Sequence, residues 1–391
     1  MNNSKIYDVI IVGGGPAGST AGYILSKAGL RVLIIDKSRF PRHKLCGGCI
    51  TDKTVKLLGR VFGETAEGLK KNNIINFASG RCEIFYRNKR ILDKEGGTPF
   101  YFVQRYAYDD FFLGKTRQAG AHLIEGERVS SVDTERGLVR TSSGKEFASE
   151  FIIGADGINS IIRRQFPEEA FDRAAWRSGL GAALEIFISR SDLPQSMDHP
   201  ALCFDYRNYG YAWAFPNKDR LVIGAGGLLR GDRKKFLLSM HDFLSVLNIK
   251  NPGPYQAKGY TFPYGNYLQK PVFRSVLLAG DAAGFADPLL GEGIFYAQRS
   301  AELASHAVLD ALGGNKEKAS RNIYAAERYV RLLEKDIFTE FEYALKIRDF
   351  LFKAFRTTGH FPVKLLLNLL GTKPIEAVHG SRSYNWLKRK G

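Results

Sequence analysis

A glycine-rich loop near the N-terminus has the residue types and spacing that can hold a phosphate group. Gly13, Gly15 and Gly18 form the pattern G-x-G-x-x-G, with Pro16 and Ala17 inside it. In such a loop the first glycine allows a tight turn, the second lets a pyrophosphate approach the backbone, and the third lets a helix pack closely on a strand. The free N–H groups at the start of that helix form a positive dipole end. The loop therefore predicts a dinucleotide site.

The elements expected around this loop are those that position a dinucleotide. Residues 7–12 form a β-branched run typical of a buried parallel strand, and residues 19–27 have the pattern of a helix. Residues 30–35 form a second strand, which closes at Asp36. A carboxylate at this distance can accept hydrogen bonds from ribose hydroxyls, so Asp36 and the adjacent Lys37 are candidate cofactor-binding residues.

Two later segments each end a predicted strand in a turn that contains an aspartate. Residues 151–157 read FIIGADG, and residues 276–284 read VLLAGDAAG ahead of a predicted helix at 294–309. These segments resemble the Asp-Gly and Gly-Asp motifs of FAD enzymes related to aromatic hydroxylases. The resemblance implies that FAD is the dinucleotide, that the aspartate of Gly-Asp holds the ribityl chain, and that a helix N-terminus faces the flavin. Five further candidate cofactor-binding residues follow from the resemblance: Asp156, Gly280, Asp281, Gly291 and Gly293.

A cysteine-containing segment and an aromatic segment narrow the resemblance. Residues 41–49 read PRHKLCGGC, and residues 211–216 read YAWAFP. They resemble the P-R-x-K-x-C-G-G and Y-x-W-x-F-P segments of geranylgeranyl reductases, which saturate prenyl chains of lipids, chlorophyll precursors and quinones. Arg105 resembles an arginine of that family that approaches the flavin. The resemblance covers roughly residues 5–310 and departs from the family at Asn217, where a lysine is frequent.

The aromatic segment predicts an apolar wall. Tyr211, Trp213 and Phe215 alternate with small residues, so a strand would place all three rings on one face. Large rigid rings make a flat apolar surface with few rotamers to lose, which suits a prenyl chain; an ordinary packed sheet face is the alternative. Lys218 and Arg220 are the candidates for a basic mouth that would contact a substrate head group.

Cys46, Gly47 and Gly48 are the candidate catalytic residues. A thiol in an apolar pocket stays protonated, so Cys46 could deliver a proton beside the flavin, or it could simply be a small buried hydrophobic residue. The two glycines would let the backbone approach the isoalloxazine ring. Cys49 is expected to pack, with a Cys46–Cys49 redox pair as the alternative. A single C-x-x-C supplies too few ligands for a structural zinc ion, so no metal is expected.

The length of 391 residues predicts more than one domain. The patterns indicate an α/β fold (α+β overall), with a Rossmann-type FAD-binding domain, an antiparallel-sheet substrate domain and a helical C-terminal segment. The expected ranges are 1–72, 102–175 and 270–312 for the FAD-binding domain, 73–101 and 176–269 for the substrate sheet, and 313–391 for the helical, basic C-terminal region.

The charge is uneven along the chain. The formal net charge is +17, and residues 343–391 hold ten Lys and Arg against two Asp and Glu. Within this region residues 362–370 are mostly apolar, which suits a helix at a membrane surface; a helix packed across the substrate domain and a solvated basic tail are the alternatives. No nucleic-acid motif accompanies the charge. No apolar run is long enough to span a bilayer and no signal-peptide core is seen, so a cytoplasmic protein, peripheral at a membrane, is expected.

The resemblance implies an FAD-dependent reductase that saturates carbon–carbon double bonds of geranylgeranyl or other prenyl chains, by hydride from reduced flavin plus a proton. The electron donor, NADPH or ferredoxin, would act without a dedicated domain, because no second G-x-G-x-x-G lies in a strand–helix frame. One alternative is an FAD-dependent monooxygenase of an aromatic or isoprenoid substrate. The other is an FAD electron-transfer protein whose basic tail docks an acidic redox partner.

Overall fold

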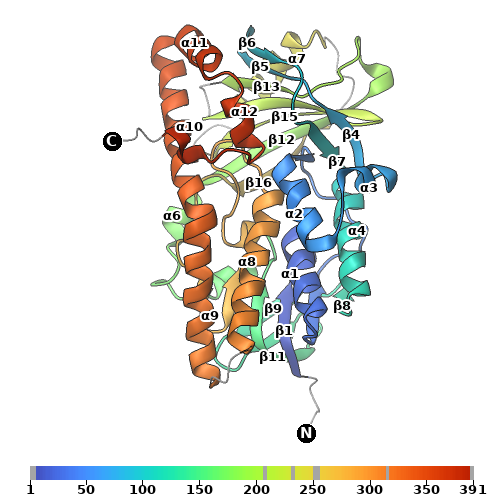
Figure 1. Cartoon of the computed structure of the whole chain (residues 1–391), viewed down its shortest axis with the longest axis vertical. Helices are drawn as coiled ribbons and strands as arrows, with labels where there is room; N and C mark the ends of the chain where they lie inside the picture. The colour runs from blue at the N-terminus through green and yellow to red at the C-terminus, as the bar shows by residue number, and fades with distance from the viewer. Residues whose placement is uncertain (1–5, 206–208, 230–233, 250–255, 314–316, 388–391) are drawn as a thin grey trace.

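One large sheet of the computed structural model combines strands that are far apart in the sequence (Figure 1). The structure describes residues 6–205, 209–229, 234–249, 256–313 and 317–387. The strand order is β17-β18-β11-β1-β2-β8, and β10 and β9 extend the sheet from β11. The strands are β1 Ile6–Val12, β2 Val32–Asp36, β8 His122–Glu125, β9 Val129–Asp133, β10 Leu138–Thr141, β11 Glu146–Gly154, β17 Val272–Phe273 and β18 Val276–Leu278.

The centre of this sheet is parallel and buried on both faces. β1 pairs with β2 on one side and with β11 on the other, and β11 pairs with β18. Val9, Ile10 and Ile11 are fully buried, which explains why β1 is a continuous apolar run instead of an alternating one. The helices around this sheet are α1 Pro16–Lys27, α4 Arg105–Gln118, α5 Ile161–Arg164, α6 Arg173–Ser178 and α8 Ile294–Leu312.

Two element boundaries differ from the sequence prediction. The first helix begins at Pro16 and not at Ser19, because a proline is well tolerated in the first turn of a helix, where its missing N–H is not needed. The second strand begins at Val32, two residues later than predicted. It ends at Asp36, as predicted, so this carboxylate lies at the carboxyl end of the parallel sheet.

The second large sheet is mostly antiparallel, with the order β16-β12-β15-β14-β13-β5-β6; only β13 and β5 pair in parallel. Its strands are β5 Cys82–Tyr86, β6 Lys89–Lys94, β12 Leu180–Ser189, β13 Ala201–Asp205, β14 Gly210–Pro216, β15 Arg220–Leu228 and β16 Lys258–Pro263. Helix α7, Lys234–Val246, covers one face with Met240 and Phe243, which share a core cluster with Ile186 and Ile223.

A third, small sheet has the order β3-β7-β4 and was not expected from the sequence. Its strands are β3 Cys49–Ile50, β7 Phe100–Val103 and β4 Ile75–Ser79, and the helices near it are α2 Asp52–Phe62 and α3 Ala66–Lys71. β3 follows the cysteine segment directly, so the pairing of Cys49 with Phe102 anchors that segment. The mixed α/β fold class is confirmed; the residue ranges of the domains remain a prediction.

The C-terminal helices form a column that continues from the first sheet to the second (Figure 1). They are α9 Lys318–Leu333, a π-helical turn at Glu334–Phe338, α10 Thr339–Thr358, α11 His360–Leu370 and α12 Lys373–Val378, followed by a 3-10 turn at Tyr384–Leu387. The hydroxyl of Tyr329 on α9 donates to the Leu278 carbonyl at 2.9 Å, and Arg348 on α10 donates to the Tyr264 carbonyl at 2.8 Å. Among the described residues, none of the helices has both the length and the apolar character to cross a bilayer.

Candidate functional site

A cavity of about 1660 Å³ is lined by both large sheets and by the C-terminal helices. The glycine-rich loop, Asp36 and Asp281 line one part of it, and Trp213 and Leu367 line another. Typical small-molecule pockets have volumes of roughly 300–1,000 Å³. The cavity is therefore large enough for a dinucleotide and a second ligand together.

The glycine-rich loop has the geometry of a phosphate cradle. Gly13 has φ +103, and a Cβ atom there would lie 2.4 Å from the carbonyl oxygen of Ala155. A Cβ on Gly18 would lie 1.8 Å from the Gly13 carbonyl oxygen, so this glycine is needed for close packing. Gly15 is different, because its Cβ would meet only the Arg42 guanidinium, at 3.3 Å. Gly15 is also the N-cap of α1 and provides no side-chain cap, so the first N–H groups of α1 are left for a ligand.

Asp36 is held at the edge of this cradle by two backbone donors. Its Oδ2 accepts from Gly14 N at 2.6 Å and its Oδ1 accepts from Ser38 N at 2.7 Å. Each carboxylate oxygen can accept a second hydrogen bond, so the fixed carboxylate can also receive ribose hydroxyls. Lys37 lines the cavity beside it and is exposed.

The two later aspartates also line the cavity. Asp156 Oδ2 accepts from Ile161 N at 2.7 Å, while its Oδ1 is buried with no partner among the described residues. Burial raises the pKa of Asp156. Asp281 Oδ2 lies 3.4 Å from Lys44 Nζ, so the cysteine segment reaches over the Gly-Asp turn. The loop, the open helix start and these carboxylates fit FAD, with its pyrophosphate at α1 and its polyhydroxyl chain among the aspartates.

The start of α8 completes this side of the cavity. Gly280 and Gly291 have φ +61 and +67, and both line the cavity. Gly293 is the N-cap of α8 and carries no side-chain cap. The N-terminus of α8 is therefore open toward the cavity, where its dipole favours negative charge on a bound ring.

A buried ion pair beside this helix start was missed in the sequence. Lys53 Nζ of α2 lies 2.6 Å from Glu292 Oε2, and Glu292 also accepts from the Thr51 hydroxyl at 3.0 Å. Although burial acts to lower it, the Glu292 carboxylate raises the pKa of Lys53, so the lysine stays charged. Glu292 lies between the two predicted glycines, and the pair ties α2 to the turn before α8. The sequence did contain a signal for this pair, because Glu292 is a charged residue inside a glycine-rich turn.

The cysteine segment lies against the aromatic wall. Gly48 has φ +71, and a Cβ there would lie 2.0 Å from the Val103 carbonyl oxygen. A Cβ on Gly47 would lie 2.6 Å from the Phe215 ring. Cys46 is half-buried with its thiol free, and Gly48 N donates to its Sγ at 3.4 Å. Both glycines are therefore required for the segment to bring Cys46 to the cavity, where all three residues lie.

Cys49 differs from Cys46 in its surroundings. It lies in β3 with a free thiol, and burial raises its pKa well above the ordinary value. A thiol that resists deprotonation is a poor partner for disulfide exchange. This supports a packing role for Cys49 over a redox pair with Cys46.

Arg105 forms a buried charged cluster next to Cys46. Its guanidinium donates to both oxygens of Asp109, at 2.7 and 2.8 Å, and Asp109 is fully buried. Although burial acts to lower it, the Asp109 carboxylate raises the pKa of Arg105, and the Cys46 thiol adds a smaller effect in the same direction. Arg42 completes the cluster, with its NH2 atom 3.2 Å from Asp109. The Arg42 guanidinium lies 3.3 Å from the position that a Cβ on Gly15 would take, so the cluster links the cysteine segment to the phosphate cradle.

Tyr211, Trp213 and Phe215 form the aromatic wall and all line the cavity. The ring centroids of Tyr211 and Trp213 are 5.7 Å apart, and those of Trp213 and Phe215 are 6.3 Å apart. A Cβ on Gly224, the register partner of Trp213, would lie 2.4 Å from the indole. The glycine therefore lets the indole lie flat across the sheet.

The C-terminal helices, which carry no motif, supply another wall, in keeping with the alternative of a helix packed across the substrate domain. It includes Phe355 of α10, Val363 and Leu367 of α11 and Val378 of α12. By contrast, the structure does not bring Lys218 and Arg220 to the cavity. Arg220 is a surface residue whose NH2 atom pairs with Asp219 at 2.6 Å. The predicted basic mouth is therefore wrong in its position.

The comparisons with known proteins identify the family of this chain. The sequence matches the FAD binding domain family over residues 6–203. It is 30% identical to a geranylgeranyl diphosphate reductase of Rhodobacter capsulatus over 79% of this chain and 77% of that protein. It is 28% identical to a digeranylgeranylglycerophospholipid reductase of Methanococcus vannielii, over 74% and 73% of the two chains. The crystal structure of a geranylgeranyl bacteriochlorophyll reductase-like protein from Thermoplasma acidophilum has a TM-score of 0.75 at 20% identity, over 89% and 88% of the two chains. The chain thus belongs to the geranylgeranyl reductase family and is an FAD-dependent oxidoreductase.

Proposed function

We propose that this protein saturates carbon–carbon double bonds in the prenyl chain of a lipid, chlorophyll precursor or quinone. The observation that carries the proposal is the cavity, which is lined by a phosphate cradle and by a long apolar wall that joins Trp213 to the C-terminal helices. FAD, when bound and reduced, would supply the hydride that one alkene carbon accepts. The remaining tasks belong to the residues of the chain.

The first of those tasks is to hold and align an apolar chain. Tyr211, Trp213 and Phe215 offer ring faces, and aliphatic residues of α11 and α12 offer further apolar surface in the same cavity. An isolated alkene reacts with hydride poorly, so alignment over the cofactor and exclusion of water contribute directly to the rate. The fixed register of β14 on β15 supplies this rigidity, because each ring is anchored on a paired strand.

The second task is to provide a proton for the other alkene carbon. Cys46 has a free thiol on the cavity surface, held by Gly47 and Gly48 against the aromatic wall. A thiol at this place can donate its proton as the hydride is transferred. The electron donor that would reduce FAD is NADPH or ferredoxin. The sequence has no second G-x-G-x-x-G in a strand–helix frame that would bind NADPH.

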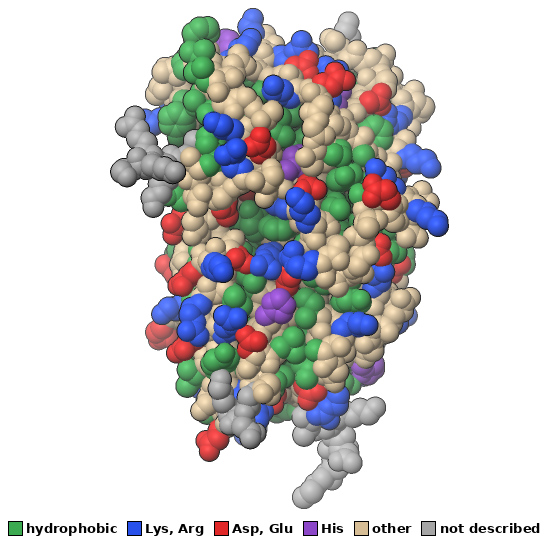
Figure 2. All heavy atoms as spheres, in the orientation of Figure 1, with side chains coloured by type: hydrophobic (Ala, Val, Ile, Leu, Met, Phe, Trp, Pro, Cys, Tyr) green, Lys and Arg blue, Asp and Glu red, His purple; other side chains and the backbone are tan. Residues whose placement is uncertain are grey.

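The third element of the proposal is contact with a membrane surface. Helix α11 has two apolar faces. Val363, Leu366, Leu367 and Leu370 line the cavity. Phe361, Leu365 and Leu369 follow at four-residue spacing and are 71%, 52% and 75% exposed. Figure 2 shows hydrophobic side chains gathered over α10 and α11 at the upper left of the molecule.

Basic residues accompany this exposed face. Lys353, Arg356 and Lys364 are all exposed on α10 and α11. Apolar side chains flanked by basic ones fit the interface of an anionic lipid bilayer. Because the opposite face of α11 lines the cavity, a prenyl chain could pass from the bilayer to the site along this helix.

The test is the mass of the product. The FAD-loaded protein is reduced chemically without oxygen and incubated with geranylgeranyl substrates that carry diphosphate, glycerolipid or chlorophyllide head groups. We expect a gain of two hydrogens per reduced bond without oxygen. A gain of one oxygen, seen only in air with NADPH, would identify a monooxygenase. Flavin oxidation by a redox protein with no change in mass of any substrate would favour electron transfer.

The two cysteines provide a matched pair of variants for this experiment. Cys46→Ala should lower the rate of product formation by roughly 10²-fold or more while FAD content is retained, because only the proton donor is removed. Cys49→Ala should keep a rate close to that of the parent protein. The opposite ranking of the two variants would remove Cys46 from its proposed role.

A further inference from the structure

The aromatic wall contains one buried carboxyl group that the reductase proposal does not use. Glu185 lies in the middle of β12 and is fully buried. Its register partner is Gly224, and Gly224 is also the partner of Trp213. Side chains of residues in register across an antiparallel sheet lie on the same face. Glu185 therefore lies on the cavity face, behind the indole.

Within the described part of the chain, no Lys or Arg forms an ion pair with Glu185; Lys258, its partner on β16, is exposed at the sheet edge. The groups that face it are the hydroxyl of Tyr260, 3.4 Å from Oε1, the indole N–H of Trp213 and the backbone of Cys46. Burial raises the pKa of Glu185 to about 7, and these three groups oppose that rise.

Two unpartnered atoms make the site able to change its charge. Glu185 Oε2 and Trp213 Nε1 are both buried, and neither has a hydrogen-bond partner among the described residues. One is an acceptor and the other a donor, so a small rotation would join them when the carboxyl group ionises. A purely structural residue here could be apolar at lower cost, because an unpaired buried carboxyl group is expensive.

We propose that Glu185 is the internal proton source that resupplies Cys46 during alkene reduction. Tyr260 and Cys46 both lie beside this carboxyl group, since the Tyr260 hydroxyl is 3.4 Å from Glu185 Oε1 and the Cys46 backbone also faces Glu185. The alkene accepts a hydride, with its two electrons, from the reduced cofactor, and a proton from the Cys46 thiol. The thiolate is reprotonated from Glu185 through Tyr260, and the carboxylate regains a proton from solvent after product leaves. Glu185 acts on the substrate only through Cys46, so we class it as a positioning residue and not as a catalytic one.

This inference rests on the proposed function, so its first readout does not require turnover. Infrared difference spectra of the FAD-loaded protein are recorded across a pH titration. We expect the carbonyl band of a protonated carboxyl group to disappear near pH 7, and the band to be absent in Glu185→Gln. Absence of such a band in the parent protein at pH 5–6 would overturn the proposal.

The second readout is the pH profile of product formation over many turnovers, without oxygen and with an excess of chemical reductant, with a prenyl substrate that the product test has identified. A proton donor must be protonated, so the parent rate should fall above about pH 7. Glu185→Gln should be roughly tenfold or more slower, without that fall, and Glu185→Asp should restore a titrating profile. Equal rates and profiles in parent and Glu185→Gln would sink the idea. If no prenyl substrate reacts with the parent protein, the proposed function fails and the infrared titration still decides whether Glu185 holds a proton.

Discussion

Single glycines decide how close side chains come to the cavity in this protein. Gly224 is the clearest case, since the Trp213 indole lies over it and leaves no room for a methyl group. Gly47 and Gly48 act in the same way for the cysteine segment. At these positions the lack of a Cβ atom is what permits the close approach, so a glycine-to-alanine substitution tests each contact with the smallest possible change.

We expect Gly224→Ala to displace the indole and weaken prenyl binding. The added Cβ would lie 2.4 Å from Trp213, so overpacking should destabilise the protein by about 1–3 kcal/mol and raise KM for the prenyl substrate. FAD content should not change, because Gly224 is remote from the phosphate cradle. KM and FAD occupancy measured together check this.

Gly114→Ala is the matched control for that variant. Gly114 lies inside α4, and nothing lies within 4 Å of a Cβ there. Alanine is the better helix former, so stability should rise by about 0.5–1 kcal/mol with no change in KM. An unchanged KM in Gly224→Ala would mean that the indole does not contact the substrate.

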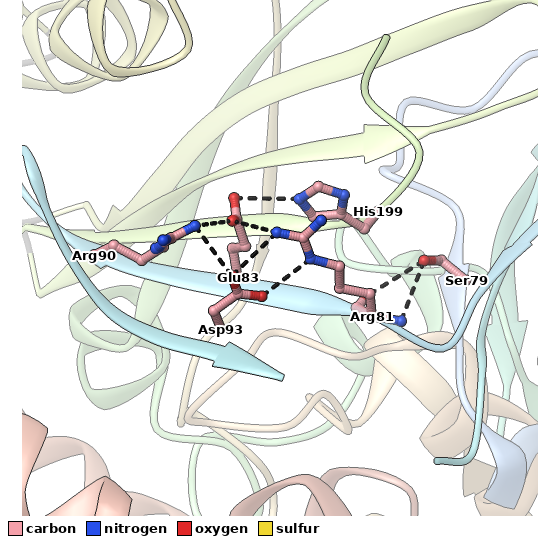
Figure 3. Close-up of polar contacts among 6 residues, drawn as sticks. All are labelled: Ser79, Arg81, Glu83, Arg90, Asp93 and His199. Carbon is pink, nitrogen blue, oxygen red and sulfur yellow. Dashed lines mark hydrogen bonds and ion pairs between the residues drawn. The ribbon is translucent and has the colours of Figure 1, made fainter. Parts of the chain in front are cut away.

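At the scale of elements, hairpins and helix ends are fixed by buried polar groups. The β5–β6 hairpin is joined to the segment before β13 by a cluster around Glu83 (Figure 3). Glu83 Oε1 lies 2.8 Å from Arg90 and 3.0 Å from Arg81, and its Oε2 lies 3.2 Å from His199 Nε2. The charged side chains of the cluster pair with one another, so its role beside the cavity is structural.

We expect Glu83→Gln to lower the free energy of unfolding by about 1–3 kcal/mol at pH 7, because two arginines lose a shared carboxylate. Although burial acts to raise it, hydrogen bonds from Arg90 and His199 hold the pKa of Glu83 below the ordinary 4.5. The contribution is therefore present above about pH 4.5 and is lost as the pH falls below it. Urea unfolding of both proteins at pH 7 and pH 4 tests this, and their curves should approach each other at the lower pH. The control is Asp198→Asn. Asp198 is an exposed carboxylate that pairs with Arg190, so its loss should change the free energy of unfolding little.

The docking of α12 depends on a neutral histidine. His379 is buried, its Nδ1 accepts from Asp52 N at 3.3 Å, and its ring lies 4.5 Å from that of Phe100. Burial lowers the pKa of His379 from 6.5 to about 4. The folded state holds His379 in its neutral form, whereas the unfolded state binds a proton below pH 6.5. The free energy of unfolding is therefore highest above pH 6.5 and falls by ~3 kcal/mol as the pH drops toward 4.

His379→Phe should remove this part of the pH dependence, because phenylalanine cannot gain a proton and can still pack on Phe100. Hydrogen exchange of residues 373–387 between pH 7 and pH 4.5 measures the effect locally. Equal acceleration of exchange in both proteins at the lower pH would show that another group controls the docking.

Local patterns predicted the cofactor side of the molecule better than the substrate side. The spacing of Gly13, Gly15 and Gly18, and the alternation that makes Trp213 a cavity residue, depend only on neighbours in sequence. Glu185 depends on the register of β12, β15 and β14, which no local pattern contains. A signal did exist, because a single charged residue inside the apolar run of residues 180–188 is costly unless it is used.

At the scale of the whole molecule, the column of C-terminal helices runs from the sheet that contains β1 to the sheet that contains β14 (Figure 1). Those helices were assigned no motif, yet α10, α11 and α12 line the cavity. Their apolar residues are spread over three helices with no common period. The sequence predicts helices here, but only the packing shows that they enclose the site.

At this scale we expect α11 to control binding to lipid. Vesicles with anionic lipid should bind the protein, and the double variant Leu365→Ser with Leu369→Ser should bind at least roughly tenfold more weakly, because two leucine side chains no longer enter the bilayer. Raised salt should weaken the binding of both proteins. Co-sedimentation with vesicles measures each.

The matched control is Ile323→Ser, which removes an apolar side chain that is 62% exposed on α9. It should leave vesicle binding unchanged. Equal loss in both variants would show that exposed apolar area in general, and not α11, drives the association.

The position of the cavity wall in the sequence has a consequence for synthesis. Every predicted cofactor-binding residue lies before residue 294, whereas the wall made by Phe355, Val363, Leu367 and Val378 comes from the last part of the chain. A nascent chain emerges from the ribosome from its N-terminus, and its domains fold in that order. FAD can therefore bind while its site is still open to solvent, and the apolar part of the cavity is completed only when the final helices are released.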